Sequence, residues 1–350
     1  MLSVKKVLKR SKSMLNKNQK EYQIVLPNKT IAILPDHRFQ TLMEKEVLPY
    51  LSSICRAGYV ASSAGTGRLY FEAYRPARAR GAVVISHGFT ESAEKYKEAI
   101  YYFTQAGYQV YLAEHRGHGR SVRDTSHPNM VHINHFSDYV RDLHTFIRKI
   151  VKPAAKGLPL YLYAHSMGGA IGAFYLEAYP HVFQKAVLTA PMLSINIGAI
   201  PSSFARAIGR VMLRHGLGES YAPGQHAYTP GEQFRGSCCS CLERYRYHKA
   251  VKDASPLFQS SGSSYSWAYQ SLNACQSITR KKNCARIKVP VLIFRSLNDD
   301  SVRAKGIRLF VGNTPSARLV KVTGSKHEIY NSPACVLEGY YKKIFQFFGP

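Results

Sequence analysis

Short apolar runs and amphipathic stretches alternate along the chain after residue 68. Apolar runs of about four to eight residues are typical of strands buried in a parallel sheet, and apolar positions repeated at helical spacing indicate helices that pack on it. The expected strands lie at 69–74 (alternating and exposed), 82–85, 109–113, 160–165, 185–191, 289–295 and 318–322. The expected helices lie at 94–106, 136–151, 302–311 and 333–348. This order predicts an α/β fold with a doubly wound, mostly parallel sheet, whose functional residues follow the carboxyl ends of its strands.

The run that starts at residue 160 ends in the sequence AHSMG, which is followed by small residues suited to the start of a helix. Ser166 therefore has the spacing of a nucleophile elbow, with Ala164 in place of the usual first glycine and Gly168 as the second. Bulky residues at these flanking positions would collide with neighbouring backbone. The elbow would expose the serine hydroxyl beside the positive end of the helix dipole. The pattern predicts a nucleophilic serine, and the alternative is a structural turn with an idle serine.

Two acids and one histidine follow later strands in the chain order of a serine hydrolase. Asp299 and Asp300 come just after the strand at 289–295, and His327 follows the strand at 318–322. Catalysis by serine needs a base that takes the hydroxyl proton and a carboxylate that orients this base. In α/β-hydrolases the order along the chain is Ser, then Asp or Glu, then His. We therefore predict Ser166 as nucleophile and His327 as base, with either aspartate as the orienting acid.

The negative charge that forms on the substrate carbonyl needs an oxyanion hole of backbone N–H groups. One N–H is expected from Met167, directly after the serine, and the other from Phe89 in the loop after the strand at 82–85. Gly88 would let the backbone of this loop approach the substrate closely. Because only backbone groups are needed, the identity of these side chains adds little to the prediction.

Residues 194–285 interrupt the alternation and are rich in Gly, Ser, Tyr, Arg and Cys. An insertion between two core strands predicts a cap, or lid, over the serine. A long disordered insertion is the alternative, and the apolar segment 204–213 favours a helical cap. The expected organisation is a basic N-terminal arm and lead-in at 1–67, a first core part at 68–193, the cap at 194–285 and a second core part at 286–350.

The chain carries 48 Lys and Arg against 21 Asp and Glu, a formal net charge of +27. Such an excess indicates an anionic partner, either nucleic acid or an anionic lipid surface, unless the whole proteome is basic. Residues 1–20 contain no acid, and their apolar positions recur at helical spacing, which predicts an amphipathic helix on an anionic membrane or else a solvated tail. No run is long enough to span a bilayer, and no secretory signal is recognisable. We therefore expect a cytoplasmic protein, free or bound to the membrane surface.

Seven cysteines in a chain without a secretory signal indicate reduced thiols. Cys238, Cys239 and Cys241 form a cluster that could bind zinc together with Cys275 or Cys284. The cluster lacks the paired two-residue spacings of structural zinc sites, so we expect neither a metal nor any other cofactor.

Several longer motifs resemble the bacterial lysophospholipase family, relatives of the monoglyceride lipases within the α/β-hydrolases. They are SHGFTES, HRGHGRS with NHFSDYVRDL, AHSMGGAI, LTAPM, YSWAYQSL and KHEI, and the likeness runs from roughly residue 70 to the C-terminus. The resemblance implies a serine hydrolase of lysophospholipids or monoacylglycerols, peripheral on the inner membrane, that forms an acyl-enzyme. It also implies Asp299 as the acid, from the family pattern Gly-x-x-Asp-x-x-Val, here with Ser296 in place of the glycine.

His115 and His118 lie in the loop motif HRGHGRS, where a metal pair is one possibility. The resemblance implies instead a structural loop, in which Arg116 is expected to pair with Glu91. The basic arm and the cysteine-rich segment are features that the family does not explain.

Other activities are compatible with the same serine. An acyltransferase would use another alcohol in place of water, and a serine aminopeptidase would share the fold and the catalytic residues. Nothing in the sequence indicates a pocket for a free amino terminus. A basic nucleic-acid-binding protein on an inactive scaffold belongs to a different class. The complete order of Ser166, Asp299 and His327 argues against it, so no nucleic acid partner is expected.

Removal of residues 1–20 tests the arm as a membrane anchor. Each Lys or Arg near an anionic surface contributes about 1 kcal/mol, and the attraction decays over about 8 Å at physiological salt. The full chain should co-sediment with anionic vesicles and not with zwitterionic vesicles, and both added salt and the truncation should weaken this binding. The truncated chain should keep its rate on a soluble ester. Unchanged binding after truncation would contradict the anchor.

Overall fold

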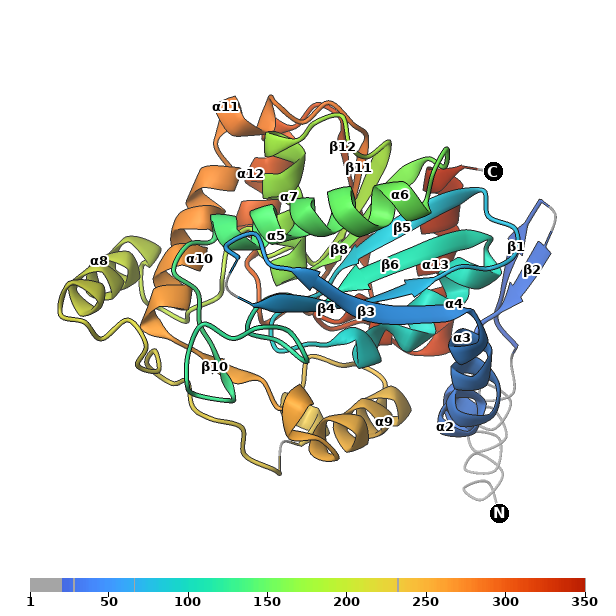
Figure 1. The fold of residues 1–350 in the computed structure, drawn as a ribbon, viewed down its shortest axis with the longest axis horizontal. Helices are drawn as coiled ribbons and strands as arrows, with labels where there is room; N and C mark the ends of the chain where they lie inside the picture. The colour runs from blue at the N-terminus through green and yellow to red at the C-terminus, as the bar shows by residue number, and fades with distance from the viewer. Residues whose placement is uncertain (1–20, 28, 66, 232, 350) are drawn as a thin grey trace, which may run out of the picture.

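The computed structural model describes residues 21–27, 29–65, 67–231 and 233–349, so the expected helix in 1–20 lies outside the described residues. An eight-stranded sheet of order β12-β11-β9-β8-β5-β6-β4-β3 forms the centre (Figure 1). Neighbours from β12 to β6 are parallel, whereas β4 is antiparallel to both β6 and β3. The predicted α/β fold with a mostly parallel sheet is thus confirmed. The strands are β3 (Cys55–Ala61), β4 (Arg68–Tyr74), β5 (Gly81–Ser86), β6 (Tyr108–Ala113), β8 (Leu160–His165), β9 (Lys185–Thr189), β11 (Val291–Ser296) and β12 (Ala317–Val322).

The central strands are apolar throughout because both faces of the sheet are covered. In β8, Leu160, Leu162 and Ala164 enter one core cluster, while Tyr161 and Tyr163 enter the cluster on the other face. Successive side chains of a strand point to opposite faces. When both faces are buried, all positions are apolar, and polar residues do not alternate with apolar ones. This burial explains the continuous apolar run that precedes Ser166.

Helices cover the two faces of the sheet (Figure 1). On one face lie α5 (Ser137–Phe146), continued by η4 (Ile147–Val151) and α6 (Lys152–Ala154), with α7 (Met167–Ala178) and α12 (Ala304–Asn313). On the other lie η3 (Ala93–Tyr96), α4 (Lys97–Gln105), η7 (Ile329–Asn331) and α13 (Ala334–Phe348). The N-terminal elements also pack there: β1 (Gln23–Leu26), β2 (Lys29–Ala32), η1 (Asp36–Arg38), α2 (Phe39–Leu42), η2 (Met43–Val47) and α3 (Leu48–Ile54).

The prediction that the strand at 69–74 is exposed was wrong. In β4, Leu69, Glu72 and Tyr74 are buried, because β3 and β6 pair with it on both sides and α4 approaches one face. Lys97 of α4 donates to Glu72 over 2.7 Å, so the polar position that suggested exposure is a buried ion pair. The alternation of polar residues in this strand therefore reflects a charged interior contact.

Residues 194–285 form two separate groups of elements (Figure 1). In the first, α8 (Ser202–Arg214) packs on α10 (Tyr265–Ile278), where Gly209 lies so close to Tyr269 that an added Cβ would be 3.0 Å from the Tyr269 Cβ. In the second, α9 (Leu242–Asp253) packs against α2. Shorter elements complete the segment: η5 (Phe234–Gly236), η6 (Pro256–Phe258), α11 (Lys281–Cys284), and β10 (Ser261–Ser263), which pairs with β7 (Met130–Val131).

Arg244 of α9 is fully buried and connects this helix to the N-terminal segment. Its guanidinium donates to both carboxylate oxygens of Glu98, at 2.9 and 2.6 Å, and to Asp36 at 2.5 Å. The remaining donors reach the carbonyl of Leu34 at 3.1 Å and the Sγ atom of Cys241 at 3.4 Å. A buried guanidinium needs this complete set of acceptors, because each unpaired N–H inside the protein would be costly.

Arg244→Met should therefore leave Glu98 buried without its partner and destabilise the protein by about 3–5 kcal/mol. Urea unfolding followed by circular dichroism would measure the loss. Arg246→Met is the matched control, because Arg246 lies two residues further along α9 and is exposed. The control should change the free energy of unfolding by less than about 0.5 kcal/mol. Equal stabilities for the two variants would contradict the structural role of Arg244.

Candidate active site

Ser166 stands at the sharp turn between β8 and α7 with φ 52° and ψ −117°. A positive φ is uncommon for a residue with a side chain, and such strain persists only where the surroundings enforce it. Here the Ser166 N–H donates to the Thr189 carbonyl at 3.1 Å, and its own carbonyl accepts from the N–H of Met192 at 2.8 Å. The turn thus fixes the serine hydroxyl above the carboxyl end of the sheet.

The small residues around the elbow are needed for close packing. A Cβ added to Gly168 would lie 2.1 Å from the carbonyl oxygen of Ser86, so only glycine fits there. Ala164, which replaces the usual first glycine, is buried, and its methyl group faces Gly172, where an added Cβ would lie 3.2 Å away. A glycine on the facing helix therefore leaves room for the extra methyl group of Ala164.

The structure brings the three predicted residues into one hydrogen-bonded row. His327 Nε2 lies 2.8 Å from Ser166 Oγ, and His327 Nδ1 lies 2.8 Å from Asp299 Oδ2. The second oxygen of Asp299 accepts the N–H groups of Ser301 at 2.9 Å and Val302 at 3.0 Å. Burial acts to raise the pKa of Asp299, but the hydrogen bond and charge of His327 and the two N–H donors lower it overall. Ser, His and Asp in this arrangement can activate the serine as a nucleophile.

Asp300, the other candidate acid, does not join this row. Its side chain is exposed, and its backbone carbonyl accepts a hydrogen bond from Asn196 Nδ2 at 2.8 Å. The loop after β11 turns so that only the first of the two neighbouring aspartates faces His327.

The two N–H groups predicted for the oxyanion hole flank the serine. Phe89 and Ser166 line the same cavity, and Met167 is the first residue of α7, where a helix leaves its N–H groups without internal partners. Among the described residues, neither the Phe89 N–H nor the Met167 N–H donates to a protein acceptor. Both groups are therefore free to donate to a substrate oxygen.

Glu91 is a central residue of the site, although the sequence predicted for it only a contact with Arg116. One carboxylate oxygen accepts the Gly88 N–H at 2.5 Å and the Tyr96 hydroxyl at 2.6 Å, and the other accepts the Tyr330 hydroxyl at 2.7 Å. Lys95 Nζ lies 3.7 Å away. Burial opposes ionisation of Glu91, but its neighbours, first His165 and then Lys95 and the two hydroxyls, lower its pKa below the ordinary value. The Glu91–Lys95 spacing of four residues is the sequence signal that could have indicated part of this contact.

The expected pairing of Arg116 with Glu91 was wrong. Arg116 Nε donates to Asp142 at 2.7 Å, and its Nη1 donates to Asp124 at 2.7 Å. Asp142 lies in α5, a helix that packs across the loop. Arg116 therefore pairs with this helix and not with Glu91. His115 and His118 make hydrogen bonds to other protein groups. The partner of His115 is the Ser86 hydroxyl and that of His118 is the carbonyl of Arg116, both at 3.0 Å.

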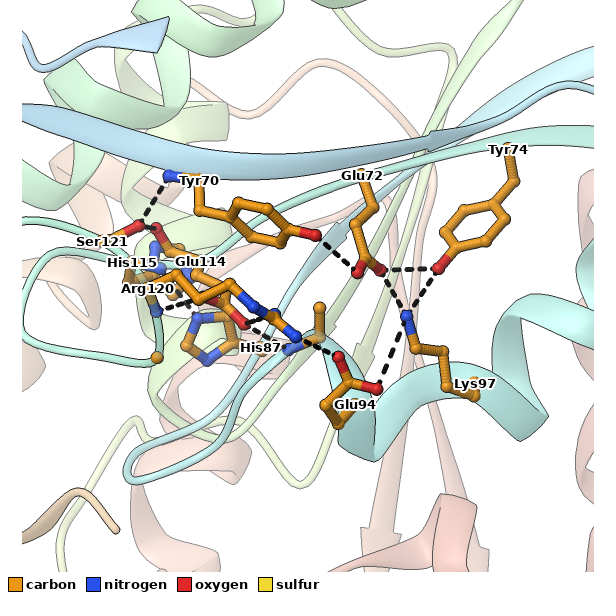
Figure 2. Close-up of polar contacts among 12 residues, drawn as sticks. Tyr70, Glu72, Tyr74, His87, Glu94, Lys97, Glu114, His115, Arg120 and Ser121 are labelled. Atoms are coloured by element: carbon orange, nitrogen blue, oxygen red, sulfur yellow. Dashed lines mark hydrogen bonds and ion pairs between the residues drawn. The ribbon is translucent and has the colours of Figure 1, made fainter. Parts of the chain in front are cut away.

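A second network of charges supports the loop that carries Phe89 (Figure 2). The Ala93 N–H donates to Glu114 at 3.0 Å, and Arg120 joins Glu114 to Glu94. The His115 N–H donates to the imidazole of His87 at 2.8 Å. The segment that contributes the expected oxyanion donor is thus fixed at both of its ends.

The cysteine cluster makes contacts with protein groups. All seven cysteines are free thiols, and Cys239 Sγ donates to the carbonyl of Asn331 at 3.1 Å. Burial raises the pKa of the Cys238 thiol to about 11, so this thiol is protonated near neutral pH. In the described part of the chain, no three His, Cys, Asp or Glu side chains are grouped so that they could hold a metal ion.

A cavity of about 540 Å³ opens above Ser166 and His327. Its walls are mostly apolar and come from the core loops, α8 and α10: Phe89, Met192, Ile195, Ile208, Trp267 and Leu272. The rings of Phe89 and Trp267 pack 4.3 Å apart, so α10 directly contacts the loop of the expected oxyanion hole.

A smaller cavity of about 170 Å³ adjoins the first, because Thr90, Lys95, Cys238 and Glu328 line both. Its other walls are mainly polar and charged, and include Glu91, Glu94, His248 and Lys249. The site therefore combines an apolar compartment with a polar one, and the serine lies in the wall of the apolar compartment.

A strained elbow serine bonded to a histidine and an aspartate, at the carboxyl end of a mostly parallel sheet, defines a serine hydrolase of the α/β-hydrolase fold. The profile of the family described as serine aminopeptidase, S33 matches residues 77–334, and the chain belongs to this family. Among the described residues, no helix is sufficiently long and apolar to cross a bilayer.

Individual relatives agree with the resemblance seen in the sequence. A probable lysophospholipase L2 from Haemophilus influenzae is 27% identical over 304 residues, which cover 86% of this chain and 94% of the relative. A monoacylglycerol lipase from Mycolicibacterium smegmatis is 29% identical over 279 residues, covering 78% and 91%. The crystal structure of a thermostable carboxyl esterase from Bacillus coagulans has the same fold, with a TM-score of 0.69 at 18% identity over 84% of this chain and 97% of that one. The predicted ester hydrolase of the lysophospholipase and monoglyceride-lipase type is thus confirmed.

Substitution of the two neighbouring aspartates should separate their roles. Asp299→Asn should lower turnover by about 10⁴-fold, because an amide in this position favours the wrong tautomer of His327. Asp300→Asn should change turnover less than about twofold, since its side chain is exposed and does not face His327. Steady-state hydrolysis of a soluble short-chain ester measures both. A larger loss for Asp300→Asn would show that the acid has been assigned to the wrong residue.

Proposed function

We propose that the protein hydrolyses the acyl ester of lysophospholipids, with Ser166 as nucleophile, His327 as general base and Asp299 as the acid that orients His327. The observation that carries the proposal is the row from Ser166 Oγ through His327 to Asp299, each contact 2.8 Å long, beside an apolar cavity that adjoins a polar one. A lysophospholipid has one acyl chain and one charged head group, joined through the ester to be cleaved.

The reaction follows from this geometry in two halves. Ser166 Oγ attacks the acyl carbonyl while His327 Nε2 takes its proton, and the N–H groups of Phe89 and Met167 stabilise the oxyanion. His327 then gives the proton to the leaving glycerol oxygen, and an acyl-enzyme remains. His327 then takes a proton from water, whose oxygen attacks the acyl carbonyl, and returns the proton to Ser166 Oγ as the bond from Oγ to the acyl carbon breaks and the fatty acid leaves. Asp299 accepts the hydrogen bond from Nδ1–H of His327 throughout and stabilises the charged imidazole.

The two compartments differ in polarity, which supports a substrate with one apolar end and one charged end. The larger cavity, bounded by α8 and α10, suits an acyl chain, because its walls are mostly apolar. The smaller cavity presents Lys95 and Lys249 beside Glu91 and Glu94, a mixture of charges that suits an ionic head group better than neutral glycerol. The Haemophilus influenzae relative is named for lysophospholipids. Monoacylglycerol is the second candidate, since the Mycolicibacterium smegmatis relative is named for it and its acyl chain would occupy the same apolar compartment.

The role of residues 194–285 as a cap also belongs to this proposal. Of this segment, α8 and α10 contribute walls to the larger cavity, while α9 contributes to the smaller one. A cap of this kind excludes water from the acyl-enzyme until the leaving group has departed. The enzyme would act on lipid at the cytoplasmic face of the inner membrane, with the basic arm of residues 1–20 as one attachment.

Ser166→Ala should abolish measurable turnover of lysophospholipid, leaving at most about 10³-fold acceleration over water from binding and the oxyanion hole. The measurement is release of fatty acid from a lysophospholipid and from a monoacylglycerol with the same acyl chain, together with labelling by a fluorophosphonate. The wild-type enzyme should be labelled and should prefer the lysophospholipid, and the variant should lose both label and turnover. Wild-type turnover in the variant would falsify the mechanism, and preference for monoacylglycerol would favour the second candidate.

A further inference from the structure

A third cavity, of about 370 Å³, lies between the loop after β9, the helices α8 and α10, and the start of α12. Three cations line it, Arg206 from α8 and Arg303 and Lys305 at the start of α12, whereas no carboxylate of the described residues does. Arg303 donates to neutral oxygens, the side-chain oxygen of Asn196 at 3.3 Å and the carbonyl of Gly198. The wall of this cavity thus presents positive charge without a carboxylate to balance it.

Two helices also begin at this cavity. The first residue of α8, Ser202, lines it, and so do Lys305 and Gly306 in the first turn of α12. The first N–H groups of a helix have no internal partner, and the helix dipole places partial positive charge there. Neither helix has an acidic residue in its first turn to offset this charge. The helix ends therefore add to the positive potential of the three side chains, and an anion is favoured at this position.

Apolar side chains form much of the remaining wall. They are Leu193, Ile195, Pro201, Leu272, Cys275 and Leu309. Ile195 and Leu272 also line the larger cavity above Ser166, so the two cavities share these side chains. A small inorganic anion would leave the apolar surface in contact with water, whereas a ligand with one anionic group and an apolar chain would use both parts of the wall.

We propose that this cavity binds a long-chain fatty acid at a site separate from the catalytic cavity. The carboxylate pairs with the cations of the wall through charge-assisted hydrogen bonds, and the chain lies against Ile195 and Leu272. The proposal rests on the proposed lipid hydrolysis, which releases such an acid on the other side of these two side chains. It adds a binding site for the product that leaves Ser166 free for the next substrate.

The test measures binding to enzyme whose Ser166 carries an alkyl fluorophosphonate adduct, so that the catalytic cavity is occupied. A fluorescent long-chain fatty acid should still bind to one saturable site. Arg206→Gln combined with Lys305→Gln should weaken its affinity about tenfold, because two cationic partners of the carboxylate are lost. The matched control is Arg214→Gln with Arg308→Gln, which removes one exposed cation from each of the same two helices outside the cavity. The control should change the affinity less than about twofold.

Displacement of the fluorescent acid identifies the class of ligand. An unlabelled fatty acid should displace it, whereas the alcohol of equal chain length and inorganic phosphate should each require at least about tenfold higher concentration. Equal displacement by phosphate would indicate a simple anion site, and equal displacement by the alcohol would exclude a role for the cations. Either result would overturn the proposal, as would absence of saturable binding or an equal loss of affinity in the control.

The proposed function can fail separately, because binding is measured without turnover. A chain that binds the fatty acid through this cavity but hydrolyses no lysophospholipid would contradict the proposed function and support the site. If the chain takes no fluorophosphonate label, the assignment of Ser166 is wrong, and comparison of the two double variants without the label still tests the cavity.

Discussion

The position of three catalytic loops depends on one buried carboxylate. Glu91 accepts the backbone N–H of Gly88 beside the expected oxyanion donor and the hydroxyl of Tyr330, three residues beyond His327. His165, directly before Ser166, is a further close neighbour of Glu91, at 3.6 Å. A buried carboxylate without partners would be very unfavourable, so the loops must keep the geometry that satisfies it. The ion pair of Lys95 with Glu328, at 2.5 Å, adds a second connection between the loop of Phe89 and that of His327.

The burial of acidic residues inside the protein also changes the charge of its surface. Among the described residues, eight acidic side chains are buried against three Lys and Arg, which are Lys97, Arg116 and Arg244. The outer surface is therefore even more cationic than the composition suggests, and its field extends over about 8 Å at physiological salt. The order of the interior and the excess of cations on the surface thus share one cause, since the acids that order the interior are withdrawn from the surface.

The sequence was sufficient for the order of the sheet strands from β4 to β12, though not for β3, and for the positions of Ser166 and His327 directly after strands, because these depend on periodicity and on local spacing. It could not separate Asp299 from Asp300 without the family pattern, since the direction of neighbouring side chains depends on how one loop turns. The partner of Arg116 was mistaken because Asp142 reaches it from a helix 26 residues away. The lead-in at 21–67 supplies Asp36 and the Leu34 carbonyl to Arg244, a contact that no local pattern in the sequence indicates. Contacts between distant segments have no local signal in the sequence.

The pairing of β9 with β11 has a consequence for how the enzyme is made. These strands are neighbours in the sheet, although the whole segment 190–290 separates them in the chain. During synthesis the serine emerges long before the strand that completes its side of the sheet, and the aspartate and histidine emerge last of all. A nascent or truncated chain therefore carries Ser166 without the contacts to His327 and, through it, to Asp299. A protein that cleaves lipids is therefore inactive until its C-terminal strands and helix have joined the sheet.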